Sequence, residues 1–388
     1  MAEVSILMVA GERSGDIYGG QLASALRERL PEVEIFGCGG EEMRRGGVQT
    51  AVDSRQFAMM GITEVASGLP RAYRAFHRLL REAAIRKPNL AVLIDSPSLN
   101  MRLAKRLKRM GIPVVYFISP QIWAWKKWRL RQLPGLVDRM VCIFDFEEEI
   151  YRKVGIPVNY VGHPLVDRVQ SRRSRERFFE EAGLNQALPL VALLPGSRAI
   201  ELRYNLPPII RAAAQLAAAR PIQFVLALAP DHSKVEVESR IRQIESRPLP
   251  LSILTDSTYD TLAHATAAVV ASGTATVEAA LLECPMVVVY RISRVTAFFA
   301  RFMVNVPFYS MVNLLAGKRV VAELIQKDLT AERIGEEMEP LLDSADRREK
   351  MRQELRGIRS RLGGGGATGR AADAMMEMLT AQPITKPL

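Results

Sequence analysis

The segment LPGSR at residues 194–198 has the composition of a phosphate-binding loop. It follows an apolar run, so Gly196 and Ser197 would present backbone N–H groups at the start of a helix, where phosphate oxygens are stabilised. Arg198 adds a planar, permanently charged group that suits a diphosphate. The alternative is a surface arginine that follows an ordinary turn.

A second segment of this kind, ASGTATVE, occupies residues 271–278. Ser272, Gly273 and Thr274 could surround a phosphate, and Glu278, one turn further on, could accept hydrogen bonds from ribose hydroxyls. Glu278 could equally be a capping-box partner of the loop. Two loops of this type in one half of the chain support each other and predict a nucleotide-diphosphate site.

A third loop, AGERSGD, spans residues 10–16 between an apolar run and a helical pattern. Its glycines would let the backbone approach a ligand closely, and Ser14 or Asp16 could cap the helix. It matches neither a P-loop nor the dinucleotide-binding pattern. A tight turn with a capped helix is the alternative. The candidate site residues of this loop are Gly11, Glu12, Ser14, Gly15 and Asp16.

Asp95 lies in LIDSPSLN at residues 93–100, at the end of an apolar run. A carboxylate at the end of a buried strand could accept a proton from an attacking hydroxyl. Taken alone, an aspartate at a strand end is more often a helix cap.

The segment FISPQIWAWKKWR at residues 117–129 interleaves Trp123, Trp125 and Trp128 with cations. Tryptophan and basic side chains suit a membrane interface, where they meet headgroups and lipid phosphates. They could also stack nucleic-acid bases, or the tryptophans could be partly buried core residues.

Short apolar runs that alternate with amphipathic stretches must position these residues. Such alternation predicts βαβ units and parallel sheets covered on both faces. We expect helices at 19–29, 69–86, 100–110 and within 330–361, with a last helix from residue 367. The expected strands are 4–10, 34–38, 90–94, 114–118, 139–143 and 158–161, then 188–194, 223–228, 252–254, 267–271 and 286–290.

The pattern breaks at residues 161–165 (VGHPL), where Pro164 suits a hinge. We therefore expect two doubly wound α/β domains, one formed by residues 1–163 and the other by residues 164–363. Four consecutive glycines at 363–366 predict a bend, after which the last helix, about 364–388, would return to the first domain.

Composition narrows the class of protein. Lysine and arginine outnumber aspartate and glutamate by 53 to 42, a net charge of +11, which favours anionic partners or reflects an arginine-rich proteome. Three separated cysteines and four histidines without ligand spacing predict reduced thiols in the cytoplasm and no metal site. The N-terminus lacks the pattern of a signal peptide, and no apolar run is long enough to span a bilayer.

Several motifs, in order along nearly the whole chain, resemble those of the lipid-A-disaccharide synthase family. Arg13 departs from the pattern, in which we expect a small residue. The matching segments are AGERSGD, MMGITEV, IDSPSLN, ISPQIWAWKKWR, YVGHPLVD, LLPGSR, ASGTATVEAALL, NLLAG and GGGGATGRAA.

The resemblance implies a GT-B glycosyltransferase fold, in which two Rossmann-like domains face each other across a cleft. The second domain would bind UDP-2,3-diacylglucosamine and the first 2,3-diacylglucosamine 1-phosphate, giving the β-1′,6-linked lipid A disaccharide 1-phosphate and UDP. The family acts without a cofactor or metal and lies peripherally on the cytoplasmic face of the inner membrane of Gram-negative bacteria. Anionic lipids are then the expected surface partners.

The resemblance also implies roles for individual residues. Asp95 would be the general base and Arg198 would bind the diphosphate, in a single displacement with inversion. Ser14 and Gly15 would lie in a loop that closes over the cleft. The residues that fall in the donor-side motifs are Glu278, Asn313, Glu323 and Gln326.

Both substrates carry acyl chains, which predicts apolar surface beside the site. Arg291 and nearby arginines would suit headgroup contact. For each apolar candidate, an ordinary place in the core is the alternative. The candidates are Phe57, Met59, Met60, Phe298 and Phe302.

Two other functions remain open at this point. A UDP-GlcNAc 2-epimerase would share the architecture and the recognition of UDP but would need no acyl surface. A nucleic-acid-binding protein would use the tryptophan segment, yet it would leave the phosphate loops without a role, so we expect no nucleic-acid partner. The sequence leaves open whether the chain forms a homodimer.

Overall fold

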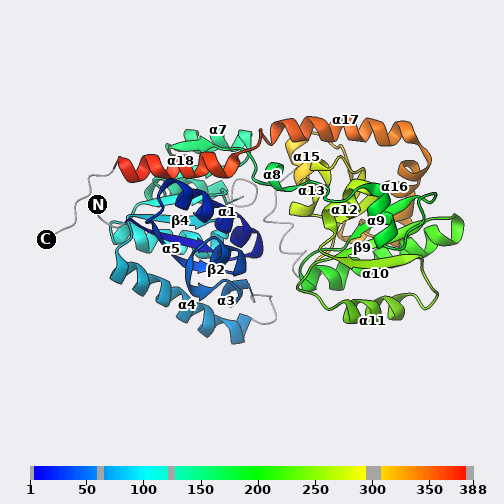
Figure 1. Ribbon diagram of the computed structural model, residues 1–388, viewed down its shortest axis with the longest axis horizontal. Helices are drawn as coiled ribbons and strands as arrows, with labels where there is room; N and C mark the ends of the chain where they lie inside the picture. The colour runs from blue at the N-terminus through cyan, green and yellow to red at the C-terminus, as the bar shows by residue number, and fades with distance from the viewer. Residues whose placement is uncertain (1–3, 59–64, 121–126, 294–306, 382–388) are drawn as a thin grey trace. The chain divides into compact units, whose positions relative to one another are not determined.

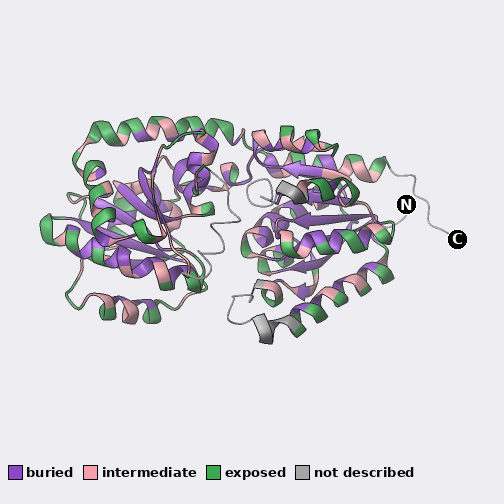
Figure 2. Cartoon of the chain, turned by 180° about the vertical axis from the view of Figure 1, so that it is seen from behind, coloured by how far each residue is buried: buried purple, intermediate pink, exposed green. Residues whose placement is uncertain are grey.

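The computed structural model describes residues 4–58, 65–120, 127–293 and 307–381 of the chain. It contains two compact units, Met1–Pro164 with Leu362–Leu388 and Leu165–Arg361, called here the first and second unit. Each is built on a parallel sheet whose strands are buried beneath helices with exposed outer faces (Figures 1 and 2). The predicted α/β class with two parallel sheets is confirmed.

The sheet of the first unit has seven strands in the order β3-β2-β1-β4-β5-β6-β7. The central strands β1, β4 and β5 are almost entirely apolar because helices cover both faces of the sheet. The strands are β1 (Ser5–Ala10), β2 (Glu34–Gly39), β3 (Gln49–Asp53), β4 (Leu90–Ile94), β5 (Val114–Phe117), β6 (Arg139–Cys142) and β7 (Val158–Tyr160).

The helices of the first unit follow the strands in alternation. They are α1 (Arg13–Arg29), α2 (Glu41–Arg45), α3 (Arg55–Ala58), α4 (Val65–Arg86), α5 (Pro97–Arg109), η1 (Lys127–Gly135), α7 (Asp145–Lys153) and α18 (Ala367–Thr380).

The sheet of the second unit has six strands in the order β10-β9-β8-β11-β12-β13. The strands are β8 (Leu190–Leu194), β9 (Gln223–Leu228), β10 (Leu251–Thr255), β11 (Ala267–Ala271), β12 (Met286–Tyr290) and β13 (Ala322–Ile325). The helices are α8 (Leu165–Arg168), α9 (Arg175–Glu181), α10 (Ala199–Ala219), α11 (Lys234–Ile244), α12 (Thr258–His264), α13 (Thr274–Leu281), α15 (Met311–Ala316), η2 (Gln326–Asp328), α16 (Ala331–Asp343) and α17 (Ala345–Arg361).

The last helix returns to the first unit, as predicted. In Figure 1, α18 (red) runs beside α1 (blue), and the two helices pack together. Its buried face carries small side chains and Met375, which is fully buried. Arg29 pairs with Asp373 at 2.6 Å, an exposed ion pair worth at most about 1 kcal/mol, so apolar packing holds the helix in place.

The strand order reverses once in each sheet, between β1 and β4 and between β8 and β11, which are hydrogen-bonded neighbours. In open α/β sheets, ligands bind beyond the carboxyl ends of the strands at this reversal. In the first unit, the reversal brings the loop at residues 10–16 next to Asp95. In the second, it brings residues 194–198 next to residues 271–274. The loops predicted from sequence therefore converge in pairs.

Two further findings bear on the predictions from composition. All three cysteines are free and buried. No helix in the described part of the chain is long and apolar enough to span a membrane.

Candidate active site

Asp95 directly follows β4 and has a left-handed backbone conformation, with φ of +48°. The next residue, Ser96, also has a positive φ, of +41°, and is the N-cap of α5. Such a conformation costs a residue other than glycine on the order of 1–3 kcal/mol, and it is found preferentially at functional sites. The Asp95 side chain is half-buried. Asp95 is therefore not the helix cap that the alternative interpretation expected.

Gly11 explains how the two loops of the first unit fit together. A Cβ atom on Gly11 would lie 2.9 Å from Ser96 Oγ and 3.2 Å from Ser96 Cβ. Only glycine therefore lets the loop after β1 approach the turn at Asp95 and Ser96 this closely. The close approach at Gly11 is thus made to side chains of the turn and of α5, and approach to a ligand stays a prediction.

The expected capping of α1 by Ser14 or Asp16 is wrong. The helix begins at Arg13, its N-cap is Glu12, and no side chain caps it. Asp16 instead accepts hydrogen bonds from the N–H groups of Gly40, Glu42 and Met43 at 2.5–3.1 Å. Its buried carboxylate thus caps α2, because a negative charge is stabilised at a helix N-terminus. Ser14 and Gly15 lie in the first turn of α1.

His163 is buried against the rings of Tyr18 and Phe144 at centroid distances of 6.2 and 5.4 Å. Burial lowers the pKa of the imidazole to about 3, because the charged form would lose its hydration. This histidine is therefore neutral at physiological pH. Its ring contributes to the packing of the first unit just before the chain enters the second unit.

In the second unit, Gly196 has φ of +123°, and a Cβ there would lie 2.5 Å from the Glu201 side chain. Glu201 accepts hydrogen bonds from the N–H groups of Ser197 at 2.9 Å and Arg198 at 3.2 Å. The chain's own carboxylate thus occupies the start of α10, where we expected phosphate. Phosphate binding by the Ser197 N–H would require Glu201 to move, and this role stays a prediction.

The Arg198 guanidinium lies 3.4 Å from Glu201 Oε1, and its side chain is 62% exposed. An ion pair this long and exposed is weak. Binding of a diphosphate by Arg198 stays a prediction.

The loop at residues 271–274 starts α13 differently. Gly273, with φ of +144°, is the N-cap, and no side chain caps the helix. A Cβ on Gly273 would meet no atom within 4 Å, so the space above this helix start is open. Ser272 Oγ donates to the Tyr309 carbonyl at 3.0 Å, and Thr274 is exposed. This loop offers the helix N-terminus that residues 194–198 do not.

Asn313 and Glu323 are brought together, as the donor-side motifs predict. Asn313 is fully buried, and its amide group donates to Glu323 at 2.8 Å and to the Val321 carbonyl at 3.0 Å. Its Oδ1 accepts from the N–H groups of Val320 and Val321. Asn313 is thus saturated by the protein and positions the segment that leads into β13, while direct donor contact stays a prediction.

Glu323 also holds the segment that leads into α15, whose N-cap is Ser310. Its carboxylate accepts from the N–H groups of Tyr309 and Ser310, both at 2.9 Å, and from Ser310 Oγ at 2.7 Å. Because Tyr309 is bonded to Ser272, Glu323 connects β13 with the loop that starts α13. The predicted donor residues Ser272, Asn313 and Glu323 therefore form one hydrogen-bonded cluster.

Gln326, with φ of +54°, follows β13, and its side-chain amide pairs with the backbone of Ile292 at 3.2 Å. Arg291 donates to the Gln326 carbonyl at 3.1 Å and to the Leu329 carbonyl, and burial lowers its pKa. Its guanidinium is thus bonded to the chain's own backbone, which corrects the expected contact with headgroups.

Sequence reasoning missed Asn205, which connects the loop after β8 with the segment after β12. Asn205 is fully buried in α10, donates to the Pro195 carbonyl and accepts from the Arg291 N–H, both at 2.9 Å. Residues 194–198 are thereby tied to the loop that carries Gln326. The sequence of α10 also contains charged and polar residues such as Glu201 and Arg203, so nothing in it singles Asn205 out.

Glu278 accepts a hydrogen bond from Tyr259 Oη at 3.1 Å and makes no capping box with the loop. Burial raises the pKa of this half-buried carboxyl, and the hydrogen bond partly opposes the effect. Its role in binding ribose stays a prediction.

The predicted acyl and membrane residues fall largely outside the described residues: Met59, Met60, Trp123, Trp125, Phe298 and Phe302 do so. Trp128 belongs to η1. Phe57 is half-buried and packs against the core of the first sheet, in keeping with the alternative interpretation. No group of three acidic, histidine or cysteine side chains in the described part of the chain could hold a metal ion.

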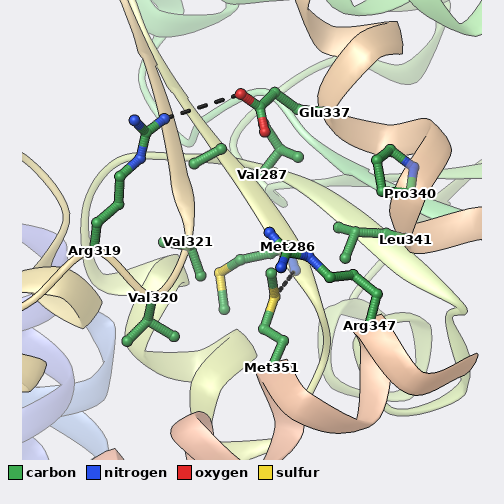
Figure 3. Close-up of a pocket in the computed structure, with 11 residues that line it drawn as sticks. Met286, Val287, Arg319, Val320, Val321, Glu337, Pro340, Leu341, Arg347 and Met351 are labelled. Carbon is green, nitrogen blue, oxygen red and sulfur yellow. Dashed lines mark hydrogen bonds and ion pairs between the residues drawn. The ribbon is translucent and has the colours of Figure 1, made fainter. Parts of the chain in front are cut away.

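A cavity of about 340 Å³ lies in the second unit, at the amino-terminal end of the strands and thus opposite the converging loops. It is bordered by Met286 and Ala322, which begin β12 and β13. Figure 3 shows Met351 and Leu341 closing it and Arg319 reaching toward Glu337, 3.9 Å away. Because the converging loops follow the carboxyl ends of the strands, this cavity is not at the candidate active site.

Solved structures with the same fold include enzymes of nucleotide sugars. The UDP-GlcNAc 2-epimerase from Neisseria meningitidis bound to UDP-GlcNAc is 14% identical, with a TM-score of 0.63 over 98% of this chain and 100% of that one. The calicheamicin glycosyltransferase CalG4 is 17% identical, with a TM-score of 0.61 over 98% and 99%. At these identities the likeness concerns the fold, which is the GT-B fold of glycosyltransferases.

The chain belongs to the lipid-A-disaccharide synthetase family, whose model matches residues 6–368. Lipid-A-disaccharide synthase of Myxococcus xanthus (strain DK1622) is 45% identical over 96% of this chain and 97% of its own length. That of Solibacter usitatus (strain Ellin6076) is 41% identical over 97% and 98%. Membership of this family makes the chain a glycosyltransferase of lipid A biosynthesis.

Replacing Asn313 by aspartate tests the cluster of Asn313 and Glu323. Asn313→Asp keeps the acceptor for Val320 and Val321 but places a second carboxylate against Glu323, and two adjacent carboxylates cannot both ionise at low cost. We expect a loss of roughly 3 kcal/mol at pH 8 that is partly recovered at pH 5.5, where one carboxyl can bind a proton. Thermal unfolding at both pH values, with the parent chain as reference, measures this, and an equal loss at both would contradict it.

Proposed function

We propose that the chain transfers 2,3-diacylglucosamine from UDP-2,3-diacylglucosamine to the 6-hydroxyl of 2,3-diacylglucosamine 1-phosphate. The product is the β-1′,6-linked lipid A disaccharide 1-phosphate, and UDP is released. Family membership supports the reaction. The observation that carries the mechanism is the half-buried Asp95 in a strained turn at the point where the first sheet reverses its strand order.

In the proposed reaction, Asp95 accepts the proton of the acceptor's 6-hydroxyl as its oxygen attacks the anomeric carbon of the donor. The bond between that carbon and the UDP oxygen breaks, and the leaving diphosphate takes the electron pair. One displacement of this kind inverts the anomeric centre. A positioned base contributes about 10²- to 10⁴-fold to the rate of such a step.

The leaving diphosphate is stabilised by Arg198 and by the start of α13. The Arg198 side chain is 62% exposed, and its ion pair with Glu201 is long, at 3.4 Å. The N–H groups at the uncapped start of α13 favour an anion. Glu278 then accepts hydrogen bonds from the ribose. We assign the donor to the second unit and the acceptor to the first on this basis.

Fold neighbours support a UDP-sugar donor. Two of them carry UDP or UDP-GlcNAc in their descriptions, the S. aureus MnaA–UDP co-structure and the Neisseria epimerase. The acylated substrates and the net charge of +11 support peripheral binding to anionic lipids on the cytoplasmic face of the inner membrane.

The experiment that tests the function is turnover of UDP-2,3-diacylglucosamine with the acylated monosaccharide 1-phosphate in detergent, with and without EDTA. We expect disaccharide at equal rates in both, because the proposed reaction uses no metal. Loss of product in EDTA would refute metal independence. Epimerised UDP-GlcNAc in place of disaccharide would overturn the function but leave the fold assignment intact.

Replacement of Asp95 by alanine should lower turnover by about 10²- to 10⁴-fold, since the base is lost. UDP should still bind with unchanged affinity, measured by calorimetry, because its contacts are assigned to the second unit. Ser98→Ala, at an exposed position nearby in α5, is the control. A near-normal rate for Asp95→Ala would remove Asp95 from the mechanism.

The double replacement of Trp125 and Trp128 by serine should weaken binding to anionic vesicles roughly tenfold. The reason is a loss of about 1–2 kcal/mol of binding free energy when apolar area is no longer buried in the membrane. Sedimentation with liposomes measures this. The matched phenylalanine pair should retain most of the binding. Unchanged sedimentation of the serine variant would refute a membrane role for this segment.

A further inference from the structure

Side chains from two neighbouring elements hold the backbone at Asp95. Tyr116 Oη, from β5, donates to the Asp95 carbonyl at 2.5 Å. Asn100 Nδ2, from the first turn of α5, donates to the same carbonyl and to that of Ile94, both at 2.9 Å. The last carbonyl of β4 and the first one beyond it are thus both satisfied by side chains.

The left-handed conformation makes these donors necessary. The Asp95 N–H still donates to the Phe117 carbonyl at 3.1 Å, as in a strand, but the Asp95 carbonyl no longer belongs to the strand ladder. Tyr116 and Asn100 are fully buried, and the Ile94 carbonyl accepts its bond from Asn100 at a buried position. A buried carbonyl without a donor is costly. The hydrogen bonds from these two side chains therefore stabilise the turn at Asp95.

We propose that Tyr116 and Asn100 are positioning residues for the transfer reaction. They fix the backbone angles of Asp95, hence the direction of its Cα–Cβ bond, and so hold the carboxylate where the acceptor hydroxyl must deliver its proton. The inference rests on the proposed function of Asp95 as the base. A misplacement of about 1 Å can cost 10²-fold in rate.

Two details of the surroundings fit this role. Burial raises the pKa of Tyr116, and the negative charge of Asp95 adds to the effect, so the phenol keeps its proton and remains a donor. Asn100 Oδ1 is buried and has no hydrogen-bond partner. Both bonds that the Asn100 amide donates to backbone carbonyls go to the turn.

Tyr116→Phe removes one hydroxyl and keeps the buried ring. We expect kcat to fall about 10- to 100-fold while KM for both substrates changes less than about twofold. Asn100→Ala removes the amide group with both donated bonds and should show the same split between kcat and KM. If either variant fails to fold, the other tests the inference.

Tyr151→Phe is the matched control. Tyr151 is also a fully buried tyrosine of the first unit, and its hydroxyl donates to a backbone carbonyl, that of Pro120, at 3.1 Å. The two phenylalanine variants should lower the Tm by similar amounts, but only Tyr116→Phe should lower kcat. Equal kcat values for both would overturn the inference.

Combination with Asp95→Asn shows whether Tyr116 acts through Asp95. In the Asp95→Asn background, Tyr116→Phe should change the residual single-turnover rate less than about twofold, because no base remains to be positioned. A full additional loss would overturn the inference and leave Asp95 as the base. An Asp95→Asn enzyme with normal turnover would instead refute the proposed function itself.

Discussion

A parallel sheet opens a site only where its strand order reverses, and both sheets of this chain are organised by that constraint. Connections on either side of the reversal run to opposite faces of the sheet, so the loops that leave the two central strands diverge and leave room between them. Residues separated by some 80 positions in sequence, such as Gly11 and Ser96, meet there because β1 and β4 are neighbours. The strand order therefore determines which loops can form the site, and the side chains on those loops then determine its chemistry.

Once the loops converge, the chain uses its own carboxylates to order them. Asp16 and Glu201 each accept two or three hydrogen bonds from backbone N–H groups at a helix start. These are positions where an anionic ligand would otherwise bind. The uncapped start of α13 stands out against them. The chain's own carboxylates therefore help to define the site, because they limit the helix starts at which a diphosphate can bind.

The fold class could be predicted from sequence because each central strand is a short apolar run between helical patterns. The edge strands β3 and β13 were missed, because polar residues interrupt their apolar pattern. Gln49 and Asp53 bound β3, and Glu323 lies within β13. Edge strands are half-solvated, so burial does not enforce an apolar pattern on them.

The site was predictable in its loops but not in its contacts. Asp95 and residues 271–274 could be found because strand, small-residue loop and helix follow one another in sequence. The bonds from Asp16 to α2, from Asn205 to Arg291 and from Tyr116 to the Asp95 carbonyl join residues 21–86 positions apart. No local pattern encodes such pairings, because they arise only when strands and helices pack.

The return of α18 to the first unit has a consequence for synthesis of the chain. The first unit is completed by the last part of the sequence, with Met375 buried in its core and α18 packed on α1. While the ribosome makes residues 165–361, for roughly 10–40 s at 5–20 residues per second, the surface of α1 that α18 will cover stays exposed. The first unit therefore finishes folding after the second has been made, and nascent chains carry this apolar surface until α18 has left the ribosome.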